Sequence, residues 1–384
     1  MTDAAQQISI SFSLTLALII VFAKFAPRLG LVDKPNQRKK HAGDVPLVGG
    51  IAILVTLVCS ALIWQGSDSV FSASSEATVS VFLVAASMLT ILGVVDDYRG
   101  VSVLTRTSVE IIVALILIEG LDLIPRNLGN LIGTGNLIMP DEIAYPFTVV
   151  AIFGVINAYN MLDGIDGLLS TMVLITVFAF HVFSGLKPGL ITLTITAALA
   201  AFLVSNLSLT RFVPKTFLGD AGSKLLGFTV VSLILAVTAE QVAGKKYLEP
   251  VTALYLVGLP LFDMVFITLR RIYGGRSPFS ADRTHVHHLM EALGISPRRA
   301  LALIGCGGIS LPLMGLILDY GDASTPQRFY IFVGLFVLYC LFMSQAWRVA
   351  ERYQSMRRKL ATLESNEHDS SYSAMRFERK SDES

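Results

Sequence analysis

Acidic residues recur in this sequence where long apolar stretches end. Glycines, amides and a histidine run accompany them, and the groups are Asp96-Asp97; Asn157, Asn160, Asp163 and Asp166; Asp220; Asp263; and Asp282-Arg283 with His285, His287 and His288. Carboxylates that lose solvation beside an apolar wall repel one another unless a cation neutralises them. Hard oxygen ligands, without a cysteine or a compact histidine cage, favour Mg²⁺ or Mn²⁺ over zinc. These groups therefore indicate a divalent cation site.

Basic residues and glycines lie close to the acidic groups in the sequence. Arg makes bidentate contacts to phosphate and Lys supplies a point charge. The glycines beside the carboxylates let the backbone approach a ligand closely, and they are Gly164, Gly167, Gly219 and Gly222. A divalent cation, a phosphate-bearing substrate and apolar surroundings together indicate phosphoryl transfer that involves a lipid.

Each motif taken alone also has a purely structural explanation. An Asp-Asp pair suits a helix end, and the Asp-Gly-Ile-Asp-Gly run at 163–167 suits a turn with capping aspartates. The histidine run 285–288 suits a solvated loop, and the sequence lacks the His-Glu-x-x-His frame of a zinc protease. Asp263 fits a buried helical residue bonded to a neighbouring helix as well as it fits a site. A shared site is favoured because all of these groups fall on the same side of the membrane in the topology that the basic residues predict.

The composition shows what kind of protein must position these residues. Of 384 residues, 53% are hydrophobic and only 15% are charged, with a mean hydropathy of +0.64, whereas about a quarter of residues in soluble proteins carry charge. The apolar residues fall into runs of roughly 17–25, enough to span a hydrocarbon core about 30 Å thick. We predict an all-α, polytopic membrane protein with about eleven transmembrane helices: 8–26, 47–65, 77–95, 103–121, 143–161, 167–186, 188–206, 217–239, 250–270, 299–319 and 327–347.

The basic residues orient these helices. With the amino terminus outside, 24 of the 30 Lys and Arg residues fall on the cytoplasmic side, which is the positive-inside pattern. The carboxyl terminus is then cytoplasmic, and every acidic group named above lies on or within about a turn of the cytoplasmic connections. We predict a single transmembrane domain over residues 1–350 and a polar, disordered cytoplasmic tail over 351–384.

Taken together, the motifs resemble those of the polyprenyl-phosphate N-acetylhexosamine-1-phosphate transferase superfamily, or glycosyltransferase family 4. In the order of that family the sequence has Arg38-Lys39-Lys40-His41, Pro46 with Gly49-Gly50, Asp96-Asp97, the stretch 157–167, Gly219-Asp220-Ala221-Gly222-Ser223 and His285-Val286-His287-His288. Single motifs are weak, but the ordered set is highly specific. The His-x-His-His form is similar to the bacterial branch that uses UDP-N-acetylglucosamine (UDP-GlcNAc). One departure is Gly100, where the family often has Asp or Lys.

The resemblance implies an enzyme of the bacterial inner membrane with its active site facing the cytoplasm. It would transfer GlcNAc-1-phosphate from UDP-GlcNAc to undecaprenyl phosphate and release UMP, with Mg²⁺ or alternatively Mn²⁺. This is the first membrane step of O-antigen, enterobacterial common antigen or a related envelope polysaccharide. The implied partners are the two substrates and membrane lipid, without nucleic acid. Because the family often dimerises, a homodimer is a further expectation.

The resemblance also assigns roles to individual residues. Asp220, with Asn160 or Asp163, is expected to bind the metal ion. Asp96 and Asp97 are expected to orient or deprotonate the lipid phosphate or to complete the metal shell. Asp166 is expected to contact the uracil. The diphosphate is expected to be held by Arg283, His285, His287 and His288, and the cytoplasmic rim to be closed by Lys40 and His41. Asn157 is a further expected substrate-binding residue.

Three alternatives stay open at this point. The same chemistry could use another UDP-N-acetylhexosamine, namely GalNAc, a deoxy-amino sugar or MurNAc-pentapeptide. Asp97 could act as a covalent nucleophile in a double displacement. A secondary transporter of a nucleotide sugar is the rival class, but it would place charges near the bilayer midplane within an inverted repeat, and no repeat is visible in the sequence.

Overall fold

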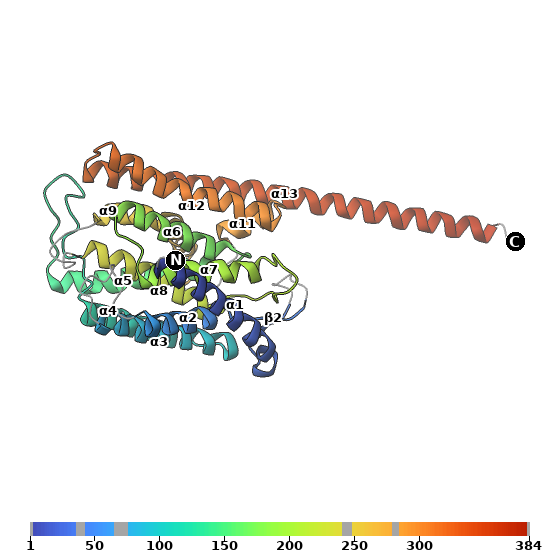
Figure 1. Ribbon diagram of the computed structural model, residues 1–384. Helices are drawn as coiled ribbons and strands as arrows, with labels where there is room; N and C mark the ends of the chain where they lie inside the picture. The colour runs from blue at the N-terminus through green and yellow to red at the C-terminus, as the bar shows by residue number, and fades with distance from the viewer. Residues whose placement is uncertain (1–2, 36–42, 65–75, 240–247, 279–283, 382–384) are drawn as a thin grey trace.

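The computed structural model describes residues 3–35, 43–64, 76–239, 248–278 and 284–381, with the backbone alone for 76–77 and 357–381. The described chain is almost entirely helical (Figure 1). Its helices are α1 (Asp3–Leu29), α2 (Gly49–Ile63), α3 (Glu76–Arg99), α4 (Val103–Leu121), α5 (Asp141–Leu162), α6 (Leu168–Ser184), α7 (Leu190–Asn206), α8 (Gly219–Thr238), α9 (Pro250–Leu256), α10 (Gly258–Tyr273), α11 (Val286–Ala292), α12 (Pro297–Tyr320) and α13 (Thr325–Ser381). Two short strands, β1 (Val32–Asp33) and β2 (Val45–Pro46), pair antiparallel with Val32 opposite Pro46.

The structure confirms an all-α, multi-pass membrane protein. Each of the eleven predicted segments overlaps a helix or, for 250–270, two helices. Within the described residues, six helices are long and apolar enough to cross a membrane, and α9 with α10 forms a further candidate bent by 84°. The apolar helices α2, α6 and α7 are shorter. The count of eleven spans and the orientation of the termini stay predictions.

The bent pair shows where apolar periodicity alone is not enough. The segment 250–270 was predicted as one helix, but α9 ends at Leu256 and α10 begins at Gly258. Pro260 lies in the first turn of α10, where a residue without a backbone N–H is tolerated because that N–H would have no intrahelical partner. Glycine and proline together therefore mark the point where the chain turns.

Helix α8 forms the centre of the bundle. It contacts α2, α3, α5 and α6, and its apolar stretch, which is long enough to cross a membrane, is completely buried inside the protein. Glycines allow this close packing, because a Cβ on Gly50 or Gly93 would overlap the backbone of α8 at Gly222 and Ala221 respectively. Small residues let membrane helices approach closely. The first turn of α8, which carries Asp220, is thereby held against α2 and α3.

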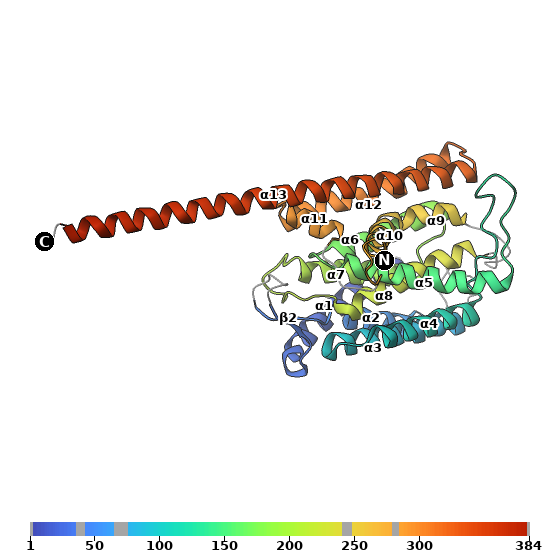
Figure 2. The same ribbon diagram turned by 180° about the vertical axis from the view of Figure 1, so that it is seen from behind.

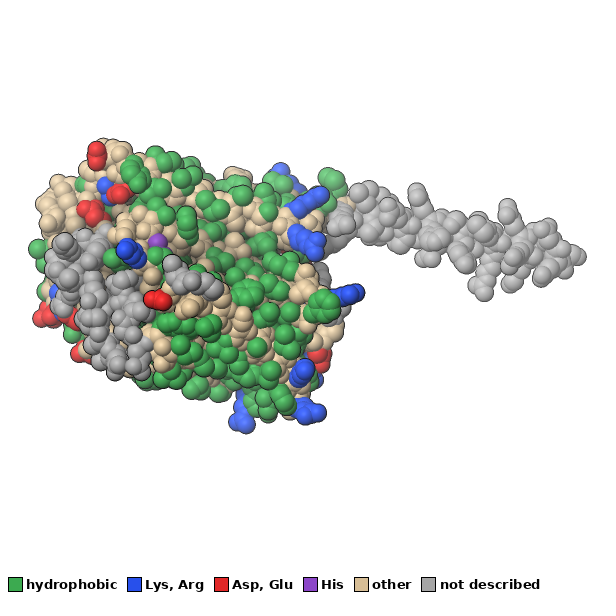
Figure 3. Space-filling view, in the orientation of Figure 1, with side chains coloured by type: hydrophobic (Ala, Val, Ile, Leu, Met, Phe, Trp, Pro, Cys, Tyr) green, Lys and Arg blue, Asp and Glu red, His purple; other side chains and the backbone are tan. Residues whose placement is uncertain are grey.

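The outside of the bundle is apolar in a broad band. Figure 3 shows this band on the visible face, with basic side chains at the end from which α13 leaves and acidic side chains toward the opposite end. Helices α12 and α13 lie side by side along one edge, and α13 continues well beyond the bundle (Figures 1 and 2). Large apolar residues on these two helices are exposed, among them Ile317, Leu338 and Phe342, as expected for side chains that face lipid. Because α13 runs to Ser381, the predicted boundary at residue 350 falls inside it, and the division into domain and tail stays a prediction.

Candidate active site

The two aspartates at the end of α3 have different partners. Asp97 accepts hydrogen bonds from the backbone N–H of Asp220 at 3.0 Å and of Ala221 at 3.4 Å. The amino end of a helix attracts negative charge because its N–H groups lack intrahelical acceptors. Gly219 makes the contact feasible, since its φ is +68° and a Cβ there would overlap the Asp97 carboxylate. Asp97 therefore links α3 to the start of α8.

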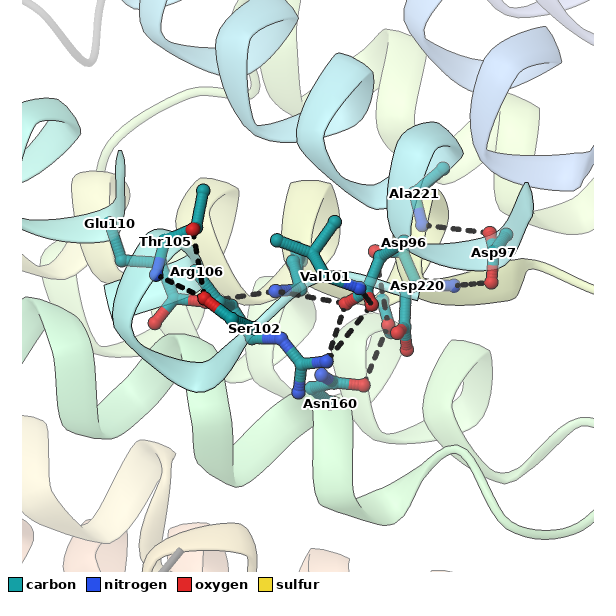
Figure 4. A network of polar contacts seen from close by, with 12 residues as sticks. Asp96, Asp97, Val101, Ser102, Thr105, Arg106, Glu110, Asn160, Asp220 and Ala221 are labelled. Atoms are coloured by element: carbon teal, nitrogen blue, oxygen red, sulfur yellow. Dashed lines mark hydrogen bonds and ion pairs between the residues drawn. The ribbon is translucent and has the colours of Figure 1, made fainter. Parts of the chain in front are cut away.

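Asp96 is buried and paired with a cation. Its Oδ1 accepts from the backbone N–H of Val101 at 2.9 Å and from Arg106 Nη2 at 3.0 Å, and Arg106 Nη2 lies 2.7 Å from its Oδ2. Arg106 reaches it from the first turn of α4, whose N-cap Ser102 accepts from the N–H of Thr105 (Figure 4). The turn between α3 and α4 is thus closed around the Asp96 carboxylate.

The end of α5 brings a third carboxylate and an amide to the same place. Asn160 Oδ1 accepts from Ser223 Oγ of α8 at 3.0 Å. Asp163 ends α5 as its C-cap. Part of its side chain is open to solvent, but the surrounding protein dehydrates the carboxyl, and the negative charges of Asp220, Asp97 and Asp166 act in the same direction, so its pKa is raised to about 7. Asp163 therefore lies in a strongly negative field.

Asp166 follows in the turn before α6. Its Oδ2 is 2.5 Å from Lys215 Nζ. The next residue, Gly167, donates its N–H to Asn206 Oδ1 at 2.6 Å, and the buried Asn206 side chain donates to the carbonyl of Thr216 at 3.0 Å. The turn 163–167 and the segment before α8 are therefore tied together, which brings a lysine to the carboxylate expected at the uracil.

The histidines reach the site through α11. His285 Nδ1 lies 2.8 Å from Asp263 Oδ2, while Asp263 Oδ1 accepts from the backbone N–H of Val286 at 3.0 Å and from the Tyr339 hydroxyl at 2.9 Å. Asp263 is 1% exposed. It is thus a buried helical residue bonded to neighbouring elements, and through His285 it also fixes the start of the histidine run.

His287 joins the histidine run to the acidic turn. Its ring packs against Gly164 so closely that a Cβ on that glycine would overlap Nε2. Burial, followed by the neighbouring His288 and His285, lowers the pKa of His287 well below its usual range, so the ring is neutral at pH 7. The rings of His287 and His288 have centroids 4.2 Å apart. The structure therefore places the histidine run beside the turn that carries Asp163.

Three predicted substrate-binding residues, Lys40, His41 and Arg283, lie outside the described residues. Their expected roles stay predictions, as do the roles of the other candidates. What the structure does show is proximity. Asp96, Asp97, Asp163 and Asp220 are joined by direct contacts or by charge. Asn160 reaches the start of α8 through Ser223, and His287 packs against the turn after Asp163.

The donor atoms of the acidic cluster suit a divalent ion. Asp163 lies in the field of Asp220 and Asp97, and carboxylate oxygens are the donors that Mg²⁺ prefers. Among the described side chains, no group of three His, Cys, Asp or Glu residues already has metal-binding geometry. The donor chemistry fits a hard cation, and ligation would require these side chains to converge further.

Sequence reasoning missed three residues next to this site. They are Arg106, Glu110 and Lys224, none of which belongs to a motif recognised in the sequence. Lys224 Nζ lies 3.0 Å from Glu110 Oε1 and 3.9 Å from Asp96 Oδ2. The available signal was an ionisable residue inside an apolar span, which is costly and suggests function.

The fold and the site define a multi-pass membrane protein in which acidic side chains and histidines meet where α3 and α5 end and α8 and α11 begin. Residues 79–238 match the family model described as glycosyl transferase family 4. Undecaprenyl-phosphate alpha-N-acetylglucosaminyl 1-phosphate transferase of Yersinia pestis is 34% identical over 94% of this chain and 96% of the relative.

Two further relatives carry the same name. The protein of Escherichia coli strain K12 is 34% identical over 91% of this chain and 94% of its own length. That of Haemophilus influenzae is 32% identical over 90% of this chain and 95% of its own length. The chain therefore belongs to glycosyl transferase family 4, a family with a general dependence on divalent metal ions.

Proposed function

We propose that this protein transfers GlcNAc-1-phosphate from UDP-GlcNAc to undecaprenyl phosphate, giving undecaprenyl-diphospho-GlcNAc and UMP. The observation that carries the proposal is the convergence of Asp97, Asp163 and Asp220 at the start of α8, in a chain similar over more than nine-tenths of its length to relatives named for this reaction. A site that concentrates negative charge at the membrane boundary suits a cation-dependent reaction between a nucleotide sugar and a lipid phosphate.

In the proposed reaction, an oxygen of the lipid phosphate attacks the β-phosphorus of UDP-GlcNAc. The bond between that phosphorus and the oxygen bridging to the α-phosphate breaks, and UMP leaves with the electron pair. The anomeric C–O bond is untouched, so the α configuration is retained. A phosphate monoester is mostly ionised at neutral pH, so the protein has mainly to position the two anions and offset their charge.

The chain's own residues divide this work. Asp97, held by two backbone N–H groups, orients the acceptor phosphate or accepts a proton from it. Asp166, freed from Lys215, contacts the uracil, and Lys215 is then available to the diphosphate. His285, His287 and His288 present ring nitrogens to the diphosphate together with Arg283, while Lys40 and His41 close the rim. Asn157 contacts substrate from α5.

Mg²⁺, or alternatively Mn²⁺, would be held by Asp220 with Asp163 or Asn160, and when bound it offsets the negative charge of the diphosphate. These residues supply oxygen atoms alone, which matches the preference of both ions. The pKa of Asp163 is raised to about 7 first by dehydration of the carboxyl and then by the negative charges of Asp220, Asp97 and Asp166, and a cation at this place would offset those charges.

The proposed setting is the inner membrane of a bacterium, with the active site facing the cytoplasm, where UDP-sugars are made. The 24 basic residues that the predicted topology assigns to one side support this orientation. The product would begin O-antigen, enterobacterial common antigen or a related envelope polysaccharide. A homodimer fits the behaviour of the family.

The test is release of UMP by protein purified in detergent, given undecaprenyl phosphate and Mg²⁺. UDP-GlcNAc, UDP-GalNAc and UDP-MurNAc-pentapeptide are supplied in separate reactions. We expect UMP from UDP-GlcNAc, and a requirement for the lipid. Release from another donor alone would reassign the sugar, and no UMP from any donor would count against a transferase.

A further inference from the structure

A lysine and a glutamate lie in the interior of the bundle, one helical turn deeper than the candidate active site. Lys224 is 0% exposed and Glu110 is 1% exposed, and their charged atoms are 3.0 Å apart. Lys224 follows Asp220 by four residues on α8, and Glu110 follows Arg106 by four on α4. Residues four apart share a helix face, so the pair lies on the faces that also carry two site residues.

The pair is continuous with the site through two contacts. Lys224 Nζ lies 3.9 Å from Asp96 Oδ2, the same oxygen that Arg106 Nη2 contacts at 2.7 Å. Glu110 Oε2 accepts from Asn157 Nδ2 at 2.9 Å. The result is a row of alternating charge made of Arg106, Asp96, Lys224 and Glu110, and Glu110 in turn contacts the Asn157 amide. Figure 4 labels Arg106, Asp96 and Glu110.

Stability alone does not account for this pair. Desolvating two charges costs more than an ordinary ion pair returns, and well-packed apolar residues of similar volume often stabilise a fold as well or better. The neighbouring residues Leu225, Leu226 and Phe228 on α8 are fully buried. A methionine at each position of the pair would have similar volume and would not carry the desolvation cost of a charge.

The geometry also shows what the pair does. Glu110 Oε1 lies 3.0 Å from Lys224 Nζ, which in turn lies 3.9 Å from Asp96 Oδ2. Asp96 therefore has two cations near it, Arg106 and Lys224, while it faces the negative charge of Asp220. Asn157 Nδ2 donates to Glu110 and also to the carbonyl of Phe153, each at 2.9 Å. With both N–H groups used in this way, the amide oxygen is the group left to face a ligand.

We propose that Glu110 and Lys224 form a positioning pair that sets the Asp96 carboxylate and the Asn157 amide for the transfer reaction. The inference rests on the proposed function, because it assigns a task within that same site. Neither residue touches the reacting atoms. They act through Asp96 and Asn157, as residues behind a metal site or catalytic group orient the groups in front.

The test compares two double variants with the wild-type chain. In Glu110→Met with Lys224→Met, both charges are replaced by apolar groups of similar volume. In Glu110→Lys with Lys224→Glu, the ion pair is kept but a negative charge now faces Asp96. Ser232→Ala is the matched control, because Ser232 is buried on the same helix and its hydroxyl donates to the Phe228 carbonyl within α8.

Three readouts separate positioning from support of the fold: thermal unfolding, Mn²⁺ affinity by electron paramagnetic resonance, and UMP release with kcat and KM resolved. We expect the Met pair to unfold near the wild-type temperature, because the relief of the desolvation cost is offset by the lost acceptor of Asn157 Nδ2. It should bind Mn²⁺ more weakly and lose roughly 10- to 100-fold in kcat. The reversed pair should also lose kcat, although it keeps an ion pair. Ser232→Ala should match wild type.

Wild-type turnover and Mn²⁺ binding in either folded double variant would overturn the inference. If the Met pair does not fold, the reversed pair carries the same test. Failure of the wild-type chain to release UMP would instead refute the proposed function. In that case the Mn²⁺ titration still reports on the pair, since it needs no turnover.

Discussion

Two adjacent carboxylates at the end of α3 have different partners. Asp96 is paired with Arg106 and also accepts from the N–H of Val101, whereas Asp97 accepts from two backbone N–H groups at the start of α8. An ion pair tolerates small shifts of its partners, but hydrogen bonds to backbone N–H groups require an acceptor at a fixed place. Substitutions at the two positions should therefore act differently.

The change Asp97→Asn should abolish most turnover. An amide that turns its NH₂ toward the N–H of Asp220 or Ala221 loses an acceptor, and a buried donor without a partner costs about 1–3 kcal/mol. It also removes the charge proposed to orient the lipid phosphate. We expect a loss of at least ~100-fold in UMP release, with exposed Glu351→Gln as the control. Substantial activity of Asp97→Asn in the presence of Mg²⁺ would rule out a role as base or nucleophile.

The changes Asp163→Asn and Asp220→Asn should weaken the dependence on the divalent ion. Each removes one negative oxygen from the carboxylates that converge at α8. The Mg²⁺ concentration at half-maximal UMP release should rise by about 10-fold or more in each variant, and excess Mg²⁺ should restore part of the rate. An unchanged half-maximal concentration in both would mean that these residues do not bind the metal.

At the scale of elements, the contact between α11 and the turn after α5 joins the histidines to the acidic cluster. Gly164 allows it, because the His287 ring occupies the space that a Cβ would take. Asp263 fixes the other end of the contact through His285 and the N–H of Val286. The distance between the two halves of the site is therefore set by one glycine and one buried aspartate.

The change Gly164→Ala should displace His287 from the acidic turn. If His287 holds the diphosphate, KM for UDP-GlcNAc should rise by about 10-fold, the effect of losing a bond of about 1.4 kcal/mol. Gly305→Ala is the control, since a Cβ on Gly305 would meet its nearest atom, on Thr171, at an ordinary 3.9 Å. Equal KM values for the two variants would remove His287 from the substrate site.

The sequence predicted most helices because hydropathy and span length act locally, as the overlap of segment 143–161 with α5 illustrates. It did not predict the turn between α9 and α10, where apolar character continues through a change of direction. It did not predict the Glu110–Lys224 pair either, because that contact joins residues 114 positions apart. The sequence could group Asp97 with Asp220 through the predicted topology and the family resemblance, but it could not predict their contact. The bond that joins them depends on helix packing at Gly93 and Gly219.

At the scale of the whole molecule, α8 is surrounded by helices and α12 and α13 cover one edge of the bundle (Figure 2). Charged side chains gather at the two ends and leave an apolar band between them (Figure 3). This arrangement lets one end hold ionised groups in water while the rest faces lipid. The end that carries the site should be the cytoplasmic one.

The predicted topology is tested with fusions to alkaline phosphatase, which is active only outside the cytoplasm. A fusion after the carboxyl terminus should be inactive, and one truncated within the outer loop, after Gly133, should be active. A fluorescent protein at the carboxyl terminus should fluoresce. An active phosphatase at the carboxyl terminus would reverse the orientation or change the number of spans by one.

The central claim, that a sugar phosphate passes intact to the lipid, is tested most directly by following the β-phosphate. Protein in detergent receives undecaprenyl phosphate, Mg²⁺ and UDP-GlcNAc labelled with ³²P at the β-phosphate, and the organic and aqueous phases are then separated. The label should enter the organic phase together with GlcNAc, and the UMP released should carry none. GlcNAc in the lipid without the label, or no label in the lipid at all, would contradict the account.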